Sequence, residues 1–305
     1  MQKLIRIGTR ESQLAVWQAT RVKELLAQHG FDADLVLIKS EGDIDLVTPL
    51  YEMGVEGIFT RSLDIALLND KIDLAVHSMK DVPTQLPGGL VQAAVLKRAS
   101  YKDLLVYKGG TDFLSNFNSS AVIATSSIRR KAQWLHRYPN HTIEILRGNV
   151  NTRLQKVTDS NWNGAIFAAA GLERINLRPK NSIELDWMLP APAQGAIMMV
   201  CREKDDFCLQ ACLNFNDAAT ASCTKIERDF LRCLLGGCST PIGALAEVKD
   251  DKLHFRGNIF SPDGKEKAEI ELYCPVNECG DNFGTIAAQQ ILLKGAKSIV
   301  ESMRK

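Results

Sequence analysis

Short apolar runs alternate with amphipathic segments through the first third of the chain. Apolar residues at helical spacing follow Ser12, which can cap a helix, and Gly30 marks the end of that helix. The predicted elements are a strand at 3–7, this helix, a strand at 35–38, a helix at 61–68 and a strand at 74–76. Such alternation is typical of a sheet covered by helices.

The same alternation starts again after a proline- and glycine-rich loop at 83–89. Its predicted elements are a strand at 121–124, a helix that ends before Pro139, and strands at 143–146 and 165–167. The pattern therefore predicts a second αβ unit with helices on both faces of its sheet.

Two connections are predicted to cross between these units, at 97–100 and at 190–195, and a strand at 196–200 is predicted to return to the first unit. We expect an α/β protein with two similar doubly wound domains, similar to those of type II periplasmic binding proteins. The expected bounds are 1–98 with 196–215 for the first domain and 99–195 for the second.

The last third changes character and predicts a smaller α+β domain over 216–305. Its predicted elements are a helix at 218–234, a three-stranded antiparallel sheet from strands at 242–248, 253–259 and 268–273, and one final helix at 283–303.

Composition excludes several classes of protein. The chain has 305 residues, of which 45% are hydrophobic and 24% charged, values that fit badly with disorder, collagen-like repeats or a coiled coil. No apolar run is long enough to span a membrane and the first residues do not resemble a secretory signal, so we expect a cytoplasmic protein without membrane contact. The eight cysteines contain no C-x2-C pair, and we expect reduced thiols and no metal site.

Charge is balanced in total, at +1, but unevenly distributed. Between 125 and 180 there are ten basic residues and three acidic ones, whereas 41–56 holds five acidic residues and no basic one. The cationic middle segment indicates an anionic partner.

Polar residues gather at three predicted strand ends, where α/β folds bind ligands: around Arg10, over His77 to Asp81, and from Thr125 to Arg130. Hydroxyls and backbone amides at a helix start, together with arginines, suit a carboxylate or phosphate. For any one arginine the alternative is a solvated or ion-paired surface side chain.

Three single residues are further candidates, each with a structural alternative. Asp81 could act on a developing cation, or form a surface salt bridge with its neighbour Lys80. His77 is better explained as a hydrogen-bonded residue at a strand end than as a base. Cys238 lies in a turn rich in glycine and proline, where an exposed thiol could serve as a nucleophile or attachment point, or the turn could be purely structural.

Seven segments, in order from Arg6 to Gly243, resemble the porphobilinogen deaminase family. They are Ile7-Gly8-Thr9-Arg10-Glu11-Ser12-Gln13-Leu14-Ala15, His77-Ser78-Met79-Lys80-Asp81-Val82-Pro83, Thr125-Ser126-Ser127-Ile128-Arg129-Arg130, Leu146-Arg147-Gly148-Asn149-Val150-Asn151-Thr152-Arg153-Leu154, Ala170-Gly171-Leu172-Glu173-Arg174, Gln194-Gly195-Ala196 and Gly236-Gly237-Cys238-Ser239-Thr240-Pro241-Ile242-Gly243. The combination covers about four fifths of the chain and is specific, although no single segment is.

The resemblance implies a transferase that condenses four porphobilinogen molecules, with loss of ammonia, on a dipyrromethane cofactor, and then releases hydroxymethylbilane by hydrolysis. It implies that Cys238 holds this cofactor through a thioether and that Asp81 assists deamination and stabilises cationic pyrroles. It further implies a monomer that binds no nucleic acid.

The resemblance also implies a set of residues that bind the carboxylates of cofactor and substrate. This set comprises Arg10, Ser12, Gln18, Lys80, Thr125, Ser126, Ser127, Arg129, Arg130, Arg147, Arg153, Gly171 and Arg174. One region departs from the family pattern, because Glu41, Glu52 and Glu56 stand where relatives usually carry basic residues. We expect that loop to face away from the cleft or to pair with cations.

Three other functions remain open on the residues alone. A bilobal anion receptor would have no use for Cys238. Nucleic-acid binding lacks exposed aromatic residues interleaved with the basic ones. A cysteine hydrolase would need Cys238 and His77, which lie in different predicted domains, to meet.

Overall fold

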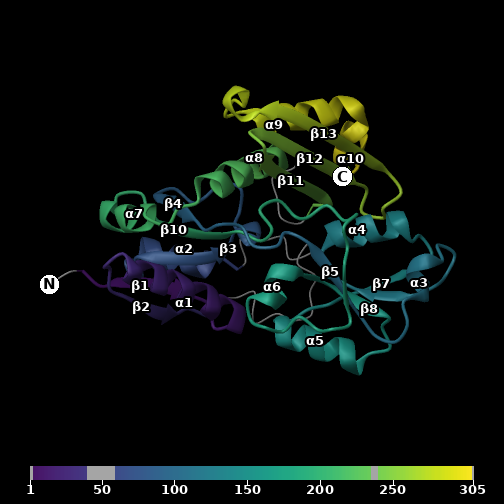
Figure 1. Cartoon of the computed structure of the whole chain (residues 1–305), viewed down its shortest axis with the longest axis horizontal. Helices are drawn as coiled ribbons and strands as arrows, with labels where there is room; N and C mark the ends of the chain where they lie inside the picture. Colours follow the sequence, from purple (N-terminus) through teal and green to yellow (C-terminus); the bar gives the residue numbers. More distant parts are fainter. Residues whose placement is uncertain (1–2, 40–58, 235–239, 304–305) are drawn as a thin grey trace.

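The first sheet of the computed structural model has five strands in the order β2-β1-β3-β10-β4 (Figure 1). These are β1 (Ile5–Thr9), β2 (Ala33–Leu37), β3 (Leu74–Ser78), β4 (Leu90–Val95) and β10 (Ile197–Arg202). β1 is parallel to β2 and β3, whereas β10 runs antiparallel between β3 and β4. The structure describes residues 3–39, 59–234 and 240–303.

Helices cover both faces of this sheet: α1 (Gln13–Gln28) and α7 (Asp206–Leu213) share one core with it, and α2 (Arg61–Leu68) packs on the other face. Ser12 caps α1 as predicted, with its side chain accepting a hydrogen bond from the backbone of Ala15. Gly30 follows the helix with a φ of +82°, a conformation that glycine adopts without a steric penalty.

The second sheet repeats this plan in the order β7-β6-β8-β5-β9. Its strands are β5 (Asp103–Tyr107), β6 (Val122–Ala124), β7 (Thr142–Glu144), β8 (Gly164–Ala168) and β9 (Ser182–Glu184). Here β5 is the antiparallel strand. The helices α3 (Asp112–Ser115) and α4 (Ile128–Arg137) pack on one face, and α5 (Val150–Asp159) and α6 (Ala169–Glu173) on the other.

Each doubly wound sheet thus contains one antiparallel strand that lies next to a crossover. The chain passes to the second sheet between β4 and β5, and returns between β9 and β10. This arrangement is that of type II periplasmic binding proteins, so the predicted fold class is confirmed, as is the return of the strand predicted at 196–200.

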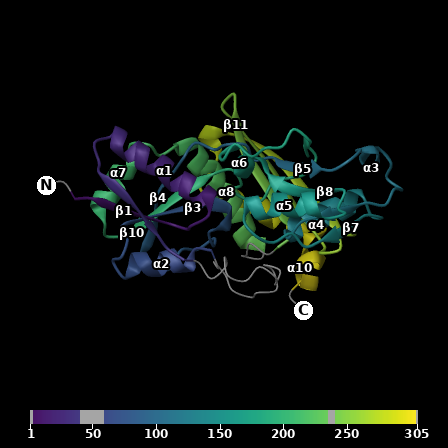
Figure 2. The same ribbon diagram turned by 90° about the horizontal axis from the view of Figure 1, so that it is seen from below.

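The third sheet is antiparallel, with strands β11 (Ile242–Lys249), β12 (Lys252–Phe260) and β13 (Lys267–Pro275) in sequence order. It shares a core with α8 (Ala218–Leu234), α9 (Phe283–Ile291) and α10 (Lys297–Met303). Figures 1 and 2 show this domain lying across the other two rather than in line with them.

The prediction of a single helix over 283–303 is wrong. A wide turn at Leu292–Ala296 separates α9 from α10, and Lys294 and Gly295 inside it are not helical. Gly295 has a φ of +103°, which the right-handed helix does not allow.

Both crossovers are hydrogen-bonded to one buried carboxylate on α8, that of Glu227. It accepts hydrogen bonds from Arg98 Nη1 at 2.6 Å and Arg98 Nη2 at 3.0 Å in the first crossover, and from the backbone of Ala193 at 2.6 Å in the second. The backbone of Ala246 on β11 also donates to it, at 2.8 Å. One side chain therefore joins both connections to the third domain.

Candidate active site

Asp81 ends a short 3₁₀ turn, Met79–Asp81, that directly follows β3. Met79 is buried and its backbone N–H donates to the carbonyl of Ala196 at 3.0 Å, which fixes the turn against the start of β10. Lys80 and Asp81 are partly exposed. The carboxylate thus stands at the carboxyl end of a parallel strand, where α/β folds bind ligands.

Two cations, one attached to each doubly wound sheet, lie within electrostatic range of Asp81. Burial lowers the pKa of Lys80 to about 8 and that of Arg153, on α5, to about 10, and the negative charge of Asp81 opposes both shifts. The Asp81 turn and helix α5 therefore face the same site.

Further cations surround this pair. After burial, the charges of Arg130, Arg147 and Arg10 also lower the pKa of Arg153. We call the interacting groups the cationic cluster, which comprises Arg10, Lys80, Arg129, Arg130, Arg147 and Arg153 together with the carboxylates of Asp81 and Asp103. Six cations against two carboxylates leave an excess of positive charge, which suits a ligand carrying several carboxylates.

The fully buried carboxylate of Asp103, at the start of β5, lies beneath the cluster. Arg130 donates to its Oδ1 from Nε at 3.1 Å and from Nη2 at 2.7 Å, and Arg129 Nη2 lies 2.8 Å from Oδ2. Although burial alone would raise the pKa of Asp103, the two guanidinium groups hold it well below its usual range. Asp103 therefore orients two arginines of the cluster.

Gln194 connects this buried pair to the Asp81 turn. Its Nε2 donates to Asp103 Oδ1 at 2.9 Å and to the carbonyl of Tyr101 at 2.7 Å, and its Oε1 accepts from Lys80 Nζ at 3.3 Å. Asp103 was not predicted from the sequence as part of the site, and Gln194 was named only as a member of a motif. The available signal was an acidic residue that opens an otherwise apolar run at 103–107.

The predicted hydroxyls of the second sheet contact the backbone. Ser127 caps α4 by accepting from the backbone of Arg130 at 3.4 Å. Ser126 Oγ donates to the carbonyl of Leu146 at 2.7 Å and accepts from its N–H at 3.0 Å, and Thr125 Oγ1 accepts from Ser127 N at 3.2 Å. These bonds shape the strand ends, and direct contact of the hydroxyls with a ligand stays a prediction.

Gly171 lies on α6 and Arg174 directly follows that helix, where it faces α1. Arg174 donates to the carbonyl of Gly195 at 2.7 Å, and its guanidinium lies 5.8 Å from the ring of Trp17. Burial lowers the pKa of Arg174 to about 10. A Cβ at Gly171 would make an ordinary van der Waals contact with Leu14 of α1 at 3.7 Å, so the two helices lie next to each other there.

Helix α1 therefore touches both sides of the site. Gln18 is buried and donates to Ser78 Oγ at 2.9 Å, at the end of β3. Gln13, one turn earlier, accepts from Asn151 Nδ2 of α5 at 2.9 Å. These contacts hold the ends of the two sheets together.

Other predicted residues lie apart from the cluster or outside the description. Cys238 and the acidic residues Glu41, Glu52 and Glu56 lie outside the described residues. His77 is buried on β3, and burial followed by the charge of Arg10 lowers its pKa to about 4, so it is neutral at neutral pH. Its buried Nε2 has no hydrogen bond to a described residue, and a hydrogen-bonded role for the imidazole as a whole stays a prediction.

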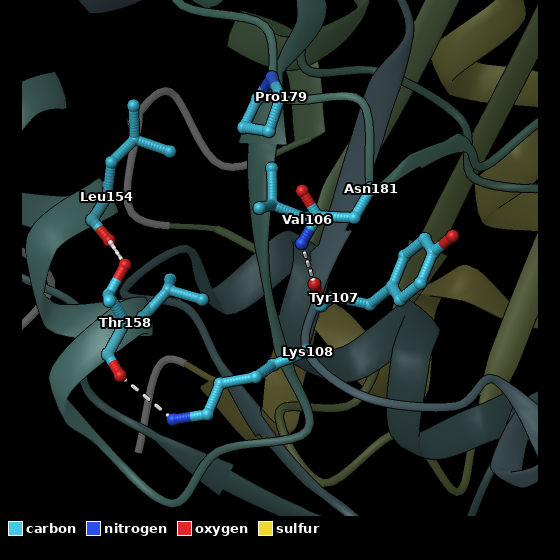
Figure 3. A pocket seen from close by; sticks show the side chains of 8 residues that line it. Val106, Tyr107, Lys108, Leu154, Thr158, Pro179 and Asn181 are labelled. Carbon is cyan, nitrogen blue, oxygen red and sulfur yellow. Dashed lines mark hydrogen bonds between the residues drawn. The ribbon is translucent and has the colours of Figure 1, made fainter.

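A pocket of about 310 Å³ lies elsewhere in the second domain (Figure 3). It opens between β5 and α5, beside Val106, Lys108 and Leu154. Lys108 Nζ donates to the carbonyl of Thr158 at 2.9 Å, so its charge is already directed at the backbone. No residue of the cationic cluster lines this pocket.

The residues that the structure describes hold no group of three or more histidine, cysteine or acidic side chains placed to bind a metal ion. None of their helices combines the length and apolar character that crossing a bilayer requires.

Comparison with known proteins identifies relatives along the whole chain. The family model for the dipyromethane cofactor binding domain of porphobilinogen deaminase matches residues 5–210, and the model for the C-terminal domain of that enzyme matches 221–292. Porphobilinogen deaminase of Chlorobium phaeobacteroides is 38% identical, over 100% of this chain and 99% of its own. That of Syntrophotalea carbinolica is 41% identical over 98% and 96%, and a probable porphobilinogen deaminase of Methanocaldococcus jannaschii is 41% identical over 90% and 94%.

The two models match in order and together span most of the sequence, and the relatives align along nearly their full length. The resemblance found in the motifs is therefore confirmed, and the chain belongs to the porphobilinogen deaminase family.

Proposed function

We propose that this chain joins four porphobilinogen molecules head to tail, with loss of ammonia, on a covalently held dipyrromethane, and releases hydroxymethylbilane by hydrolysis. In this proposal Asp81 is the catalytic residue and Cys238 holds the dipyrromethane through a thioether. The carboxylate-binding residues are those named from the sequence, with the cationic cluster at their centre.

The observation that carries this proposal is the position of Asp81 inside the cationic cluster. Pyrrole rings derived from porphobilinogen carry acetate and propionate side chains, so a chain of two to six rings is strongly anionic. Each charge-assisted hydrogen bond to such a carboxylate contributes about 1.5 to 3 kcal/mol. Burial, and then the charges of neighbouring arginines, disfavour the charged forms of Lys80 and Arg153, and carboxylates bound at this site would offset both effects.

The residues present fit a dipyrromethane, because its carboxylates would neutralise the excess charge of the cluster. Arg10, Arg147 and Arg153 would hold these carboxylates, while Arg129 and Arg130 are oriented by Asp103. When bound, the dipyrromethane supplies the free carbon of its terminal pyrrole as the nucleophile.

Asp81 acts on the incoming porphobilinogen. Loss of ammonia from that substrate leaves positive charge spread over its pyrrole ring and exocyclic carbon. A carboxylate beside the ring nitrogen accepts its N–H hydrogen bond and stabilises this charge, and it can also take up the proton that leaves after the rings join. Lys80 and Arg153, which both interact electrostatically with Asp81, would bind the substrate's own carboxylates.

We also propose the domain bounds expected from the sequence: 1–98 with 196–215, 99–195, and 216–305. Membership of the three sheets supports them, since β10 belongs to the first sheet although it follows the second in sequence. From the family resemblance we further propose a monomer that acts in the cytoplasm.

Replacing Asp81 by Asn tests the catalytic assignment. We expect the rate of porphobilinogen consumption to fall about 10² to 10⁴-fold, because the variant can no longer stabilise the positive charge. Asp32→Asn, at an exposed position between α1 and β2, serves as the matched control and should keep full activity. Activity of Asp81→Asn within a few-fold of the parent protein, at unchanged thermal stability, would remove Asp81 from its catalytic role.

Replacing Cys238 by Ser tests the attachment site independently. The purified protein should be heavier than its sequence by one dipyrromethane and should give the colour reaction of pyrroles with Ehrlich's reagent, and the Cys238→Ser protein should show neither. Cys233→Ser, which removes an exposed thiol at the end of α8, should retain both. A dipyrromethane still bound to Cys238→Ser would place the attachment elsewhere.

A further inference from the structure

Arg228, on α8 in the third domain, contacts the turn of the first domain that carries Asp81. Its Nη1 donates to the carbonyl of Val82 at 2.9 Å and to that of Met79 at 3.3 Å, and its Nη2 donates to the carbonyl of Pro83 at 2.6 Å. Asp81 lies between these carbonyls in the sequence. One guanidinium group therefore binds the backbone on both sides of the proposed catalytic carboxylate.

Other restraints on this backbone act within the first domain. The N–H of Val82 donates to the carbonyl of Met79 at 3.2 Å, which closes the 3₁₀ turn, and the N–H of Met79 binds Ala196 at the start of β10. Val82 has the extended conformation that a following proline favours, and Pro83 restricts its own φ. The turn is thus stiff, and the bonds from Arg228 fix its place relative to the third domain.

Helix α8 also precedes the proposed attachment site. It shares a core with the third sheet, and it ends at Leu234, about 9 Å along its axis beyond Arg228. Cys238 follows four residues after Leu234 in the sequence. The helix that binds the Asp81 turn is therefore the element from which the chain continues to the proposed cofactor cysteine.

We propose that Arg228 is a positioning residue, which fixes Asp81 relative to the third domain and so relative to the pyrrole chain held there. This inference rests on the proposed function, in which Asp81 acts on the substrate and Cys238 holds the dipyrromethane. Arg228 acts through the backbone of the Asp81 turn and exchanges no proton with the substrate. A displacement of about 1 Å at a reacting group can lower a rate about 100-fold, so these bonds affect the chemical step more than substrate binding.

Arg228→Gln tests this role in the full-length protein, with rates expressed per mole of dipyrromethane measured with Ehrlich's reagent. We expect kcat for porphobilinogen consumption to fall about 10- to 100-fold. KM should change less than about threefold, because all cations of the cationic cluster except Lys80 lie outside the turn. Arg228→Lys should have an intermediate kcat, since an ammonium group replaces only part of the forked contact.

Lys225→Gln is the matched control. Lys225 lies three residues earlier on α8 and donates to the carbonyl of Asp281 at 2.9 Å, a backbone contact that stays within the third domain. Its loss removes a cation and a carbonyl contact from the same helix without touching the Asp81 turn. The variant should keep the kcat of the parent protein.

A double variant separates positioning from general destabilisation. In the Asp81→Asn protein no carboxylate remains to be positioned, so adding Arg228→Gln should lower kcat by less than about twofold more. A purely structural role of Arg228 would instead lower kcat by the same factor in both backgrounds. If Arg228→Gln does not fold, Arg228→Lys supplies the same comparison.

Three outcomes overturn the inference while the proposed function stands: parent kcat in Arg228→Gln, an equal loss with and without Asp81→Asn, or an equal loss in Lys225→Gln. Failure of the proposed function gives a different result, because Asp81→Asn alone would then keep the parent rate. In that case the inference falls with it, since Arg228 is assigned to act through that carboxylate.

Discussion

Charged side chains around Asp81 lie in surroundings that oppose their own charge. Burial lowers the pKa of Lys80 to about 8 and that of Arg153 to about 10. This cost is present before any ligand arrives, and incoming carboxylates relieve it. Ligand binding at this site is therefore favoured because bound carboxylates offset charges that burial and neighbouring arginines disfavour in the free protein.

The pKa of Lys80 leads to a pH dependence. Because it is lowered to about 8, Lys80 is charged below that pH and loses its charge as the pH rises through about 8, whereas an exposed lysine stays charged to about 10.5. We expect kcat/KM for porphobilinogen to fall about 10- to 30-fold as the pH rises from about 7 to about 9.5, since the charged fraction of Lys80 falls by that factor and one charge-assisted hydrogen bond is lost with it.

Lys80→Arg provides the comparison for this pH profile, because a guanidinium stays charged over the whole range. The variant should lack the decline above about pH 8, even if its activity is lower at every pH. An identical decline in both proteins would assign the titration to another group.

The sequence predicted most of the residues that the structure brings together at this scale, among them Asp81, Arg130 and Arg153. It did not predict Asp103 and Gln194 as parts of the site. Asp103 acquires its role because β5 inserts antiparallel into the second sheet, and Gln194 because the second crossover passes beneath Lys80. Such contacts depend on chain topology, which residue spacing does not reveal.

Elements with a clear period were predicted with nearly correct bounds. The helices at 61–68 and 218–234 match α2 and α8, and Ser12 caps α1. The final helix was extended too far because apolar residues continue at helical spacing through 291–300, on both sides of Gly295. The hydrophobic pattern indicates which face is buried. It continues across the turn at Leu292–Ala296 although the backbone of Lys294 and Gly295 is not helical.

Gly295 itself offers a test of this turn. Its φ of +103° lies where a residue with a Cβ is strained, so Gly295→Ala should lower the free energy of unfolding by about 1 to 2 kcal/mol. Gly88→Ala is the matched control, because an added Cβ there meets open space and the φ of Gly88 is not positive. Urea unfolding curves measure both, and equal stability of the two variants would contradict the assigned strain.

At the scale of the whole molecule, the two crossovers are hydrogen-bonded to each other and lie in close contact. The backbone N–H of Ala99 donates to the carbonyl of Gly195 at 3.1 Å, and a Cβ at Gly195 would lie 2.7 Å from the carbonyl oxygens of both Ala99 and Ser100. Glu227 on α8 then holds the two crossovers against this helix through its ion pair with Arg98. Any hinge motion between the doubly wound domains must therefore involve both connections together.

Glu227→Ala should destabilise the protein strongly. The substitution leaves Arg98 buried without its carboxylate and two backbone N–H groups without an acceptor, so we expect a loss of about 3 to 5 kcal/mol in the free energy of unfolding. Glu24→Ala, which removes an exposed ion pair with Arg21, should change it by about 0 to 1 kcal/mol. Comparable losses of unfolding free energy for the two substitutions, measured by urea unfolding, would show that Glu227 does not hold the crossovers in place.

The position of β10 has a consequence for how the protein is made. This strand pairs with β3 on one side and β4 on the other, yet it is translated about one hundred residues after them. While the ribosome extends the chain, β3 and β4 lack this partner strand until residue 202 has emerged. By that time all strands of the second sheet have been synthesised. The segment synthesised first is thus completed after the one that follows it, and during that interval its unpaired strand edges are open to pairing with other chains.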